Sequence, residues 1–246
     1  MPYTLFISDL HLSSDREDIT ACFDAFVHSD EARQAEALYI LGDLFEYWVG
    51  DDDDTPFQRH IAALIKRLAD TMPVYFIHGN RDFMIGQRYA RQSGMTLLPE
   101  QQVIDLYGTP TLICHGDEWC TDDVEYQQYR ARIRDGWLSK VLRCLPLFVR
   151  RWLGNRIRQK SLARQQHNPL DIMIMDVTPE AVATDLRRHQ VTQTIHGHTH
   201  RPAVHRFELD GKPAVRVVLG DWYEQGSVLR VDNTGFALQS RPFVTN

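Results

Sequence analysis

Long apolar runs are absent from this sequence of 246 residues. No run approaches the ~20 consecutive apolar residues that a membrane-spanning helix needs, although hydrophobic residues make up 43% of the chain. A signal peptide is not recognisable either, because Met1-Pro2 leads straight into the strand-like segment Tyr3–Ile7. We therefore expect a globular protein of the cytoplasm.

Cysteine is scarce, and the four cysteines contain no pair at the CxxC spacing. Their number and spacing predict reduced thiols rather than disulfides or a thiolate zinc site. The sequence also lacks internal repeats, low-complexity segments and a linker that would separate two units. We expect one domain, residues 1–246.

Charge is distributed unevenly along the chain. Eleven Lys or Arg residues and a single acid, Asp135, lie between Tyr126 and His167, so this segment carries +10 and the remainder −16. Basic blocks of this kind usually have an anionic partner. Apolar residues at helical spacing run through the same segment, and Pro146 divides it into two helical parts. We expect a helical insertion at residues 122–176.

Five predicted strands end in side chains of metal-binding types. Leu38–Leu41 has the pattern of a buried parallel strand, and Gly42-Asp43 follows it. Ligands collect at the carboxyl ends of such strands. The other four predicted strands are residues 3–8, 74–77, 111–114 and 192–195. The candidate ligands at the five ends are Asp9, His11, Asp43, Asn80, His115, His196 and His198.

This set predicts a centre with two metal ions. Residues two apart in an extended chain, such as Asp9 and His11, point to the same side and can reach one ion. Seven ligands are too many for one ion, and Asp43 is the natural bridge because a carboxylate has two oxygens. All donors are nitrogen or oxygen, which favours Mn²⁺ over a structural zinc. Two ions can hold the attacking and departing oxygens of an in-line displacement.

Neighbouring polar residues are expected to have structural roles. The four aspartates at 51–54 are typical of a solvated loop, and we expect Asp54 to cap a helix over Pro56–Ala69. His78 is expected to be packed rather than to bind metal. The remaining predicted elements are a helix at 19–28, a hairpin at 102–107 and 111–114, a helix at 179–189 and β-strands at 203–239.

The strand-end residues resemble the motifs of the calcineurin-like metallophosphoesterases. The resemblance rests on Asp9-x-His11, Gly42-Asp43, Gly79-Asn80, His115-Gly116, and His196 and His198 around Gly197. It implies a four-layer αββα fold of the α/β class with a helical lid insertion. It also implies one Mn²⁺ held by Asp9, His11, Asp43 and His198, and a second held by Asp43, Asn80, His115 and His196.

Longer segments resemble one branch of that family, the diphosphatases that act on UDP-2,3-diacylglucosamine in lipid A biosynthesis. These segments are ISDLHL, LYILGDLFEYWVGDDD, FIHGNRDFMIG, CHGDEWCTDD, IMDVTPE and IHGHTHRPA. The resemblance implies hydrolysis to UMP and 2,3-diacylglucosamine 1-phosphate, by two-metal hydroxide attack on the α-phosphorus. The catalytic residues would be Asp43, Asn80, Arg81 and His196. The substrate contacts would be Asn80, Arg81, Asp123, Ser161, His196 and, as the positional match of a small polar residue, Gln165.

The chain departs from the pattern of this branch after Ser161. The segment that follows is about two residues longer and lacks the usual lysine, for which Arg164 or His167 is the expected substitute. Arg81 is also informative, because many metallophosphoesterases have a histidine there that can act as general acid. Arginine does not release its proton, whereas a sugar 1-phosphate, with a second pKa of about 6, leaves without one. A diphosphate therefore suits Arg81 better than a simple phosphodiester does, although His196 or water could still donate.

The basic insertion is expected to act as a lid that receives acyl chains while its cations meet phosphates or anionic lipid headgroups. Trp137, Phe148 and Trp152 suit this role or plain helix packing. The protein would then lie peripherally on the cytoplasmic face of the inner membrane and would not bind nucleic acid. Two alternatives stay open: a phosphoesterase for a soluble nucleotide or phosphodiester, and a metal-free scaffold without catalysis. The sequence does not predict an oligomeric state.

Overall fold

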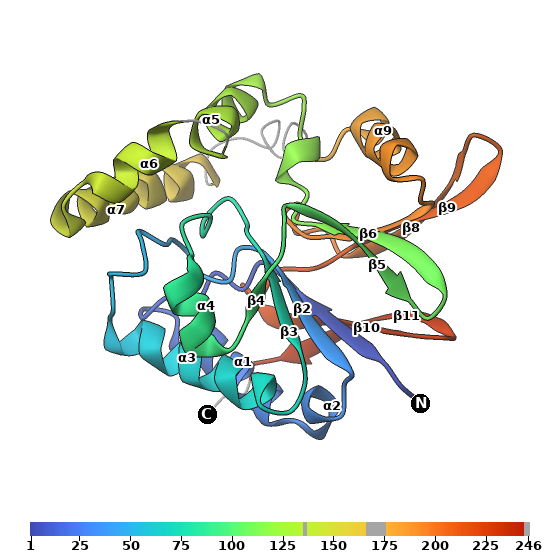
Figure 1. Cartoon of the computed structure of the whole chain (residues 1–246), viewed down its shortest axis with the longest axis horizontal. Coiled ribbons are helices and arrows are strands. Elements are labelled where there is room, and N and C mark those ends of the chain that lie inside the picture. Colours follow the sequence, from blue (N-terminus) through green and yellow to red (C-terminus); the bar gives the residue numbers. More distant parts are fainter. Residues whose placement is uncertain (135–136, 166–175, 244–246) are drawn as a thin grey trace.

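The structure, a computed structural model, describes residues 1–134, 137–165 and 176–243. Its strands form two mixed sheets (Figure 1). The first has the order β11-β10-β1-β2-β3-β4, with bounds Gly235–Pro242, Gln225–Asp232, Thr4–Ile7, Ala37–Leu41, Val74–Ile77 and Thr96–Leu97. The second has the order β5-β6-β7-β9-β8, with bounds Gln101–Leu106, Thr109–Cys114, Gln193–His196, Lys212–Val218 and Ala203–Leu209.

The parallel strands of each sheet end level with one another. Ile7 of β1 lies opposite Ile40 of β2, and Leu41 lies opposite Ile77 of β3. In the second sheet β6, β7 and β9 are also parallel neighbours. The residues that follow β1, β2, β3, β6 and β7 therefore meet at one edge of the molecule, as parallel strands require.

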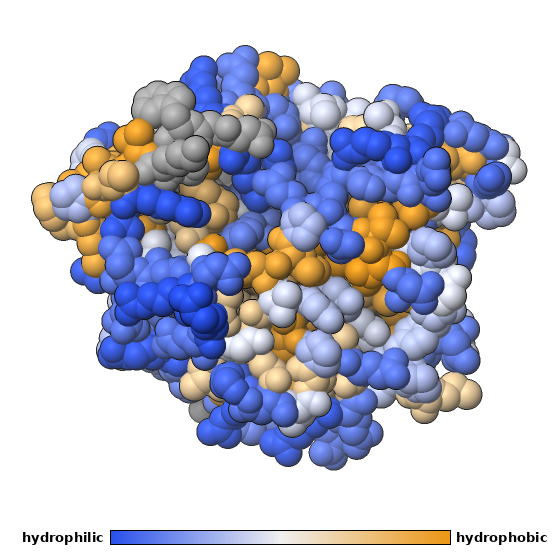
Figure 2. Space-filling view, viewed as in Figure 1, coloured by the Kyte–Doolittle hydropathy of each residue, from blue (hydrophilic) through white to orange (hydrophobic). Residues whose placement is uncertain are grey.

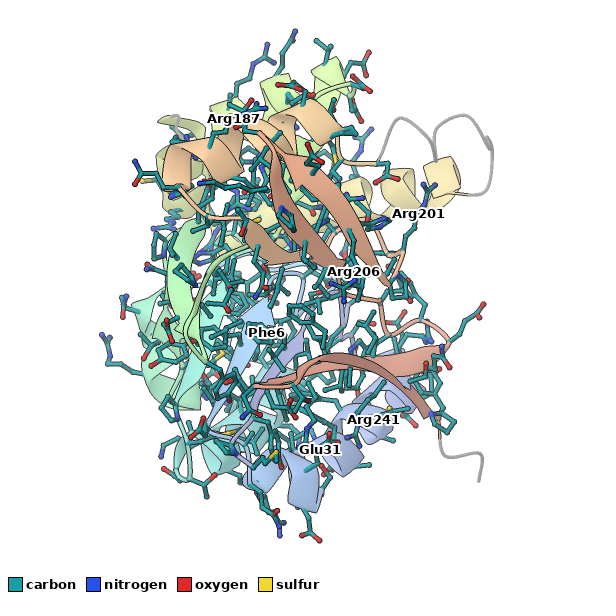
Figure 3. All side chains as sticks on the ribbon, turned by 90° about the vertical axis from the view of Figure 1, so that its right-hand side faces the viewer. Phe6, Glu31, Arg187, Arg201, Arg206 and Arg241 are labelled. Atoms are coloured by element: carbon teal, nitrogen blue, oxygen red, sulfur yellow. The ribbon has the colours of Figure 1, made fainter. Side chains whose placement is uncertain are left out.

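The two sheets pack face to face around an apolar layer. Phe6 of β1, Leu41 of β2 and Ile195 of β7 are fully buried in it, and Figure 3 labels Phe6 at this position. The helices α1 (Glu17–His28), α2 (Asp30–Arg33), α3 (Pro56–Ala69) and α4 (Gln87–Ser93) accompany the first sheet, and α9 (Pro179–His189) covers the second. This arrangement confirms the predicted four-layer αββα fold.

The described residues between β6 and β7 are mostly helical, and they lie where the sequence predicts a helical insertion. It contains the 3₁₀ turn η1 (Asp117–Trp119), then α5 (Val124–Arg134), α6 (Trp137–Cys144) and α7 (Leu147–Gln165). Pro146 lies between α6 and α7, where it ends one helix and allows the next to begin. The three helices lie together beside the strand ends (Figure 1). Within the described ranges, no helix combines the length and apolar character needed to cross a bilayer.

The aspartate run before α3 differs from its prediction. Thr55, not Asp54, caps α3, and Gln58 completes a capping box with it. Asp51 accepts hydrogen bonds from the backbone N–H groups of Gly86 and Tyr89 at the start of α4. The run is therefore tied into the structure rather than simply solvated.

Candidate dinuclear metal centre

The backbone turns sharply where the strands end. Asp9, His11 and Asp43 have positive φ angles of 55°, 50° and 52°. Residues other than glycine adopt such angles at an energetic cost, and residues strained in this way cluster at functional sites. The Gly42 and Gly79 loops touch each other, because Asp43 Oδ1 occupies the space that a Cβ on Gly79 would need. This close approach sets Asp43 in the middle of the converging loops.

The first group at this edge contains Asp9, His11 and His200. Their ligand-type atoms lie within 4.8 Å of one another. His200 Nε2 is 3.3 Å from both Asp9 Oδ1 and His11 Nε2. Asp9 Oδ2 accepts hydrogen bonds from Ser8 Oγ and from the backbone N–H of His198. Asp9 Oδ1, the other oxygen, therefore faces the group.

The second group contains Asn80, His115 and His198. Asn80 Oδ1 lies 3.0 Å from His115 Nε2 and 3.1 Å from His198 Nδ1. His115 Nδ1 donates to the carbonyl oxygen of Leu41 at 2.8 Å, so its Nε2 is the atom that faces the group. The carboxamide oxygen and two imidazoles thus converge on one point.

Asp43 lies between the two groups. Its Oδ2 is 3.9 Å from His11 Nε2, and its Oδ1 is 3.8 Å from His115 Nε2. The backbone N–H of Arg81 donates to Oδ1 at 2.8 Å and holds the carboxylate in place. One carboxylate oxygen is therefore presented to each group, as a bridging ligand would require.

His196 lies apart from both groups, unlike its expected place among the ligands. Its Nδ1 is 2.9 Å from the carbonyl oxygen of Gly197, and its ring packs edge-on against Trp119 at 5.2 Å. The cause is strand alternation: Ile195 points into the layer between the sheets, so His196 points to the opposite face. The structure thus brings His198 and His200 to the centre, where the sequence analysis expected His196 and His198.

Burial and neighbouring charges shift the pKa values of three residues in the centre. Burial opposes ionisation of Asp9, but His200, His115 and His11 hold the pKa of its carboxyl well below the usual value. Burial also opposes protonation of His115, but the Asp43 and Asp9 carboxylates raise its pKa to about 9. Burial and the charge on His115 lower the pKa of His198 to about 3, so its ring is neutral.

Two acidic residues that the sequence analysis did not select support the centre. Asp82 is fully buried and accepts from the backbone N–H groups of Leu44 and Gly79, which ties together the loops that carry Asp43 and Asn80. Glu46 lies 3.4 Å from His11 Nδ1 and 3.5 Å from Arg81 Nη1. Its carboxylate therefore faces the side of the His11 ring that points away from the centre, an arrangement that orients metal-binding histidines.

The predicted substrate residues fall into two sets. Asn80 and Arg81 lie at the centre, and Asp123 accepts from the N–H of Tyr126 at the start of α5. Ser161 and Gln165 lie on α7, and their side chains are outside the described residues, as is His167. His78 is packed as expected, with its Nε2 2.7 Å from the carbonyl oxygen of Ile85.

An apolar pocket opens beside Asn80 and Arg81. Side chains from two parts of the chain line it. Trp48, Val49, Phe83 and Met84 come from the segments that follow β2 and β3, and Tyr129, Leu142 and Leu153 come from α5, α6 and α7. Phe148 and Trp152 do not line it and are 73% and 55% exposed.

Ion pairs hold α7 over this pocket. Arg150 pairs with Asp52 through both ends of its guanidinium and also donates to the carbonyl oxygen of Val49. Arg151 pairs with Asp53. We call these two pairs the clasp; they join the acidic loop after β2 to the basic insertion.

The chain belongs to the calcineurin-like phosphoesterase family, whose model matches residues 3–202. It is also similar over nearly its whole length to curated proteins that are each described as UDP-2,3-diacylglucosamine hydrolase. The relative from Photobacterium profundum is 52% identical over 241 residues, 98% of this chain and 97% of its own. Those from Salmonella arizonae and Escherichia coli O7:K1 are 53% and 51% identical, over 93% and 98% of this chain and 94% and 99% of theirs.

Membership of this family implies bound divalent metal ions, and the residues at the centre fit them. Asp9 Oδ1, which faces the first group, is buried without a hydrogen bond to any described residue. Burying such groups unpaired is costly, and a cation on the Asp9 side would remove that cost for the carboxylate oxygen. Carboxylate, carboxamide and imidazole donors suit a divalent ion of intermediate hardness.

Proposed function

We propose that this protein hydrolyses the diphosphate bond of UDP-2,3-diacylglucosamine to UMP and 2,3-diacylglucosamine 1-phosphate. The names of the relatives support the substrate. The observation that carries the proposal is the apolar pocket that opens beside Asn80 and Arg81. A phosphoesterase for a soluble nucleotide has no use for such a pocket next to its reactive centre, whereas a diacylated sugar does.

We assign one cation to Asp9, His11, Asp43 and His200, and the other to Asp43, Asn80, His115 and His198. The ions are proposed to be Mn²⁺, because the donor set contains nitrogen and oxygen but no thiolate. Two such ions supply Lewis-acid polarisation of the phosphoryl oxygens and neutralise charge that develops there. Asp43 is common to both sets because each of its oxygens faces one of them.

Arg81 is proposed to bind the diphosphate and to stabilise the departing sugar phosphate. Its guanidinium is held near Glu46 and lines the pocket, so it lies between the cation centre and the space for acyl chains. A planar fork can take two phosphate oxygens at once. Arg81 does not serve as general acid, and a phosphate monoester with a second pKa of about 6 leaves without one.

The insertion, residues 122–176, is proposed to be the lid of the acyl site within a single domain of residues 1–246. Tyr129, Leu142 and Leu153 cover the pocket from this side. Each methylene that leaves water contributes about 0.8 kcal/mol, so long acyl chains would supply much of the binding free energy. The clasp holds α7 closed over the chains.

The outer surface of the insertion is proposed to rest on the cytoplasmic face of the inner membrane. Val141, Phe148 and Trp152 are exposed, and Figure 2 shows hydrophobic surface at the outer end of α6 and α7. Arg156 lies over the Trp152 ring at 5.0 Å. Exposed aromatics beside arginines are typical of helices that lie at a membrane surface and meet anionic lipids.

The proposal is tested by comparing two substrates that share the UDP-sugar group. We expect the purified protein with Mn²⁺ to hydrolyse UDP-2,3-diacylglucosamine with a kcat/KM at least ~10³-fold above that for UDP-N-acetylglucosamine, which lacks the long chains. That ratio corresponds to about 4 kcal/mol of acyl binding. Equal values for the two substrates would favour the soluble-nucleotide alternative.

A further inference from the structure

One face of α5 points at the cation centre rather than at the acyl pocket. Tyr126, Arg130 and Arg134 are four residues apart and share this face. Tyr129, from the neighbouring face, lines the pocket. The helix therefore separates the two parts of the proposed active site and contacts both.

Arg134 fixes the backbone that leads into Asn80. Its side chain is 7% exposed, and Nη2 donates to the carbonyl oxygens of Gly79 at 2.9 Å and His78 at 3.2 Å. Nη1 donates to Glu100 at 2.8 Å. A buried guanidinium is costly unless its donors are satisfied, and here they are satisfied largely by the loop that carries Asn80.

Tyr126 contacts the loops that carry His115 and His198, the other two residues of the second group. Its ring stacks over His198 with centroids 6.1 Å apart and planes at 27°. Its hydroxyl donates to Asp117 Oδ2 at 2.6 Å, and Arg130 Nε donates to the same oxygen at 2.9 Å. Asp117 lies two residues after His115 and is 1% exposed. This face of α5 thus contacts the loops that carry Asn80, His115 and His198, the second group, which we call the Asn80 group.

We infer that α5 is part of the cation centre, with Arg134 and Tyr126 as positioning residues for Asn80 and His198. The inference rests on the cation assignment proposed above and extends it to the insertion. α6 and α7 cover the acyl pocket, while α5 sets the geometry of the Asn80 group. Outer-shell partners of metal ligands typically change metal affinity by about 10–100-fold when they are removed.

The test uses the full chain with Arg134→Gln, Arg134→Lys and the matched control Arg132→Gln, an exposed arginine on the same helix. Mn²⁺ binding to the metal-free proteins is measured by isothermal titration calorimetry, and hydrolysis of bis-p-nitrophenyl phosphate, which has no acyl chain, is measured separately. We expect Arg134→Gln to weaken one of two binding steps and to slow hydrolysis, each by about tenfold or more. Arg134→Lys, which keeps the charge but not the fork, should lie between, and Arg132→Gln should match wild type.

A purely structural role for Arg134 would give a different result. Its variants would then lose thermal stability equally with and without Mn²⁺, and both binding steps would keep wild-type affinity. That result would overturn the inference while leaving the cation assignment intact. Should wild type bind fewer than two ions, the assignment itself would be wrong, and the inference would fall with it.

Discussion

His196 and His200 differ in what surrounds their rings, and this difference gives the sharpest test of the ligand assignment. His200 Nε2 faces Asp9 and His11, whereas the His196 ring packs against Trp119. We expect His200→Ala to bind one Mn²⁺ fewer than wild type by metal analysis after dialysis. His196→Gln should be less stable but keep two ions. The reverse pattern would restore His196 to the centre.

Arg81 is predicted to act through its planar fork as well as its charge. Arg81→Lys keeps the charge but cannot contact two phosphate oxygens in parallel. We expect kcat with UDP-2,3-diacylglucosamine to fall by roughly 10²–10³-fold, the loss typical of one preorganised donor. Steady-state kinetics with saturating Mn²⁺ measure the change in kcat. An unchanged kcat would show that catalysis does not use the planar fork of Arg81.

At the residue scale, the sequence predicted most of the residues that the structure brings together at the candidate centre, but not the partners that orient them. Asp9, His11, Asp43, Asn80 and His115 come together because each follows a parallel strand. Three histidines follow one another at intervals of two from position 196, and spacing alone does not tell which pair turns inward. The strand continues through His196, and the positive φ angles of His198 and His200 redirect the chain only after it.

At the element scale, the clasp is the feature that could not be predicted from the sequence. The aspartates at 51–54 and the arginines of α7 are about a hundred residues apart, and each group alone is typical of a solvated surface. The helices on either side of Pro146 were predictable from apolar spacing and the proline. The side chains that these helices turn toward the pocket were not predictable from the sequence. Phe148 and Trp152 face solvent instead.

Opening the clasp should weaken binding of the lipid substrate. Arg150→Lys removes the bidentate contact with Asp52 while retaining a charge. We expect KM for UDP-2,3-diacylglucosamine to rise about tenfold, equivalent to ~1.4 kcal/mol. Arg143→Gln, at an exposed arginine of α6, serves as control. Equal losses of kcat/KM with the diacyl substrate and with bis-p-nitrophenyl phosphate would show that the clasp supports the core instead.

At the scale of the whole molecule, the exposed aromatics predict a membrane-facing side. Phe148→Ser combined with Trp152→Gln should reduce binding to phosphatidylglycerol-containing vesicles by tenfold or more, because burying one such side chain is worth about 1.5–3 kcal/mol. Co-sedimentation measures the change. Hydrolysis of detergent-dispersed substrate should be retained, since neither residue lines the pocket. Unchanged vesicle binding would contradict this orientation.

The four-layer fold places the candidate cation centre and an apolar pocket side by side, with Arg81 between them. If the acyl chains occupy the pocket, the sugar phosphate is the group that departs past Arg81, and the phosphorus next to uridine is the one attacked. Hydrolysis of UDP-2,3-diacylglucosamine in ¹⁸O-labelled water, followed by mass spectrometry of both products, tests this directly. We predict one ¹⁸O atom in UMP and none in 2,3-diacylglucosamine 1-phosphate. Label in the sugar phosphate would contradict the account.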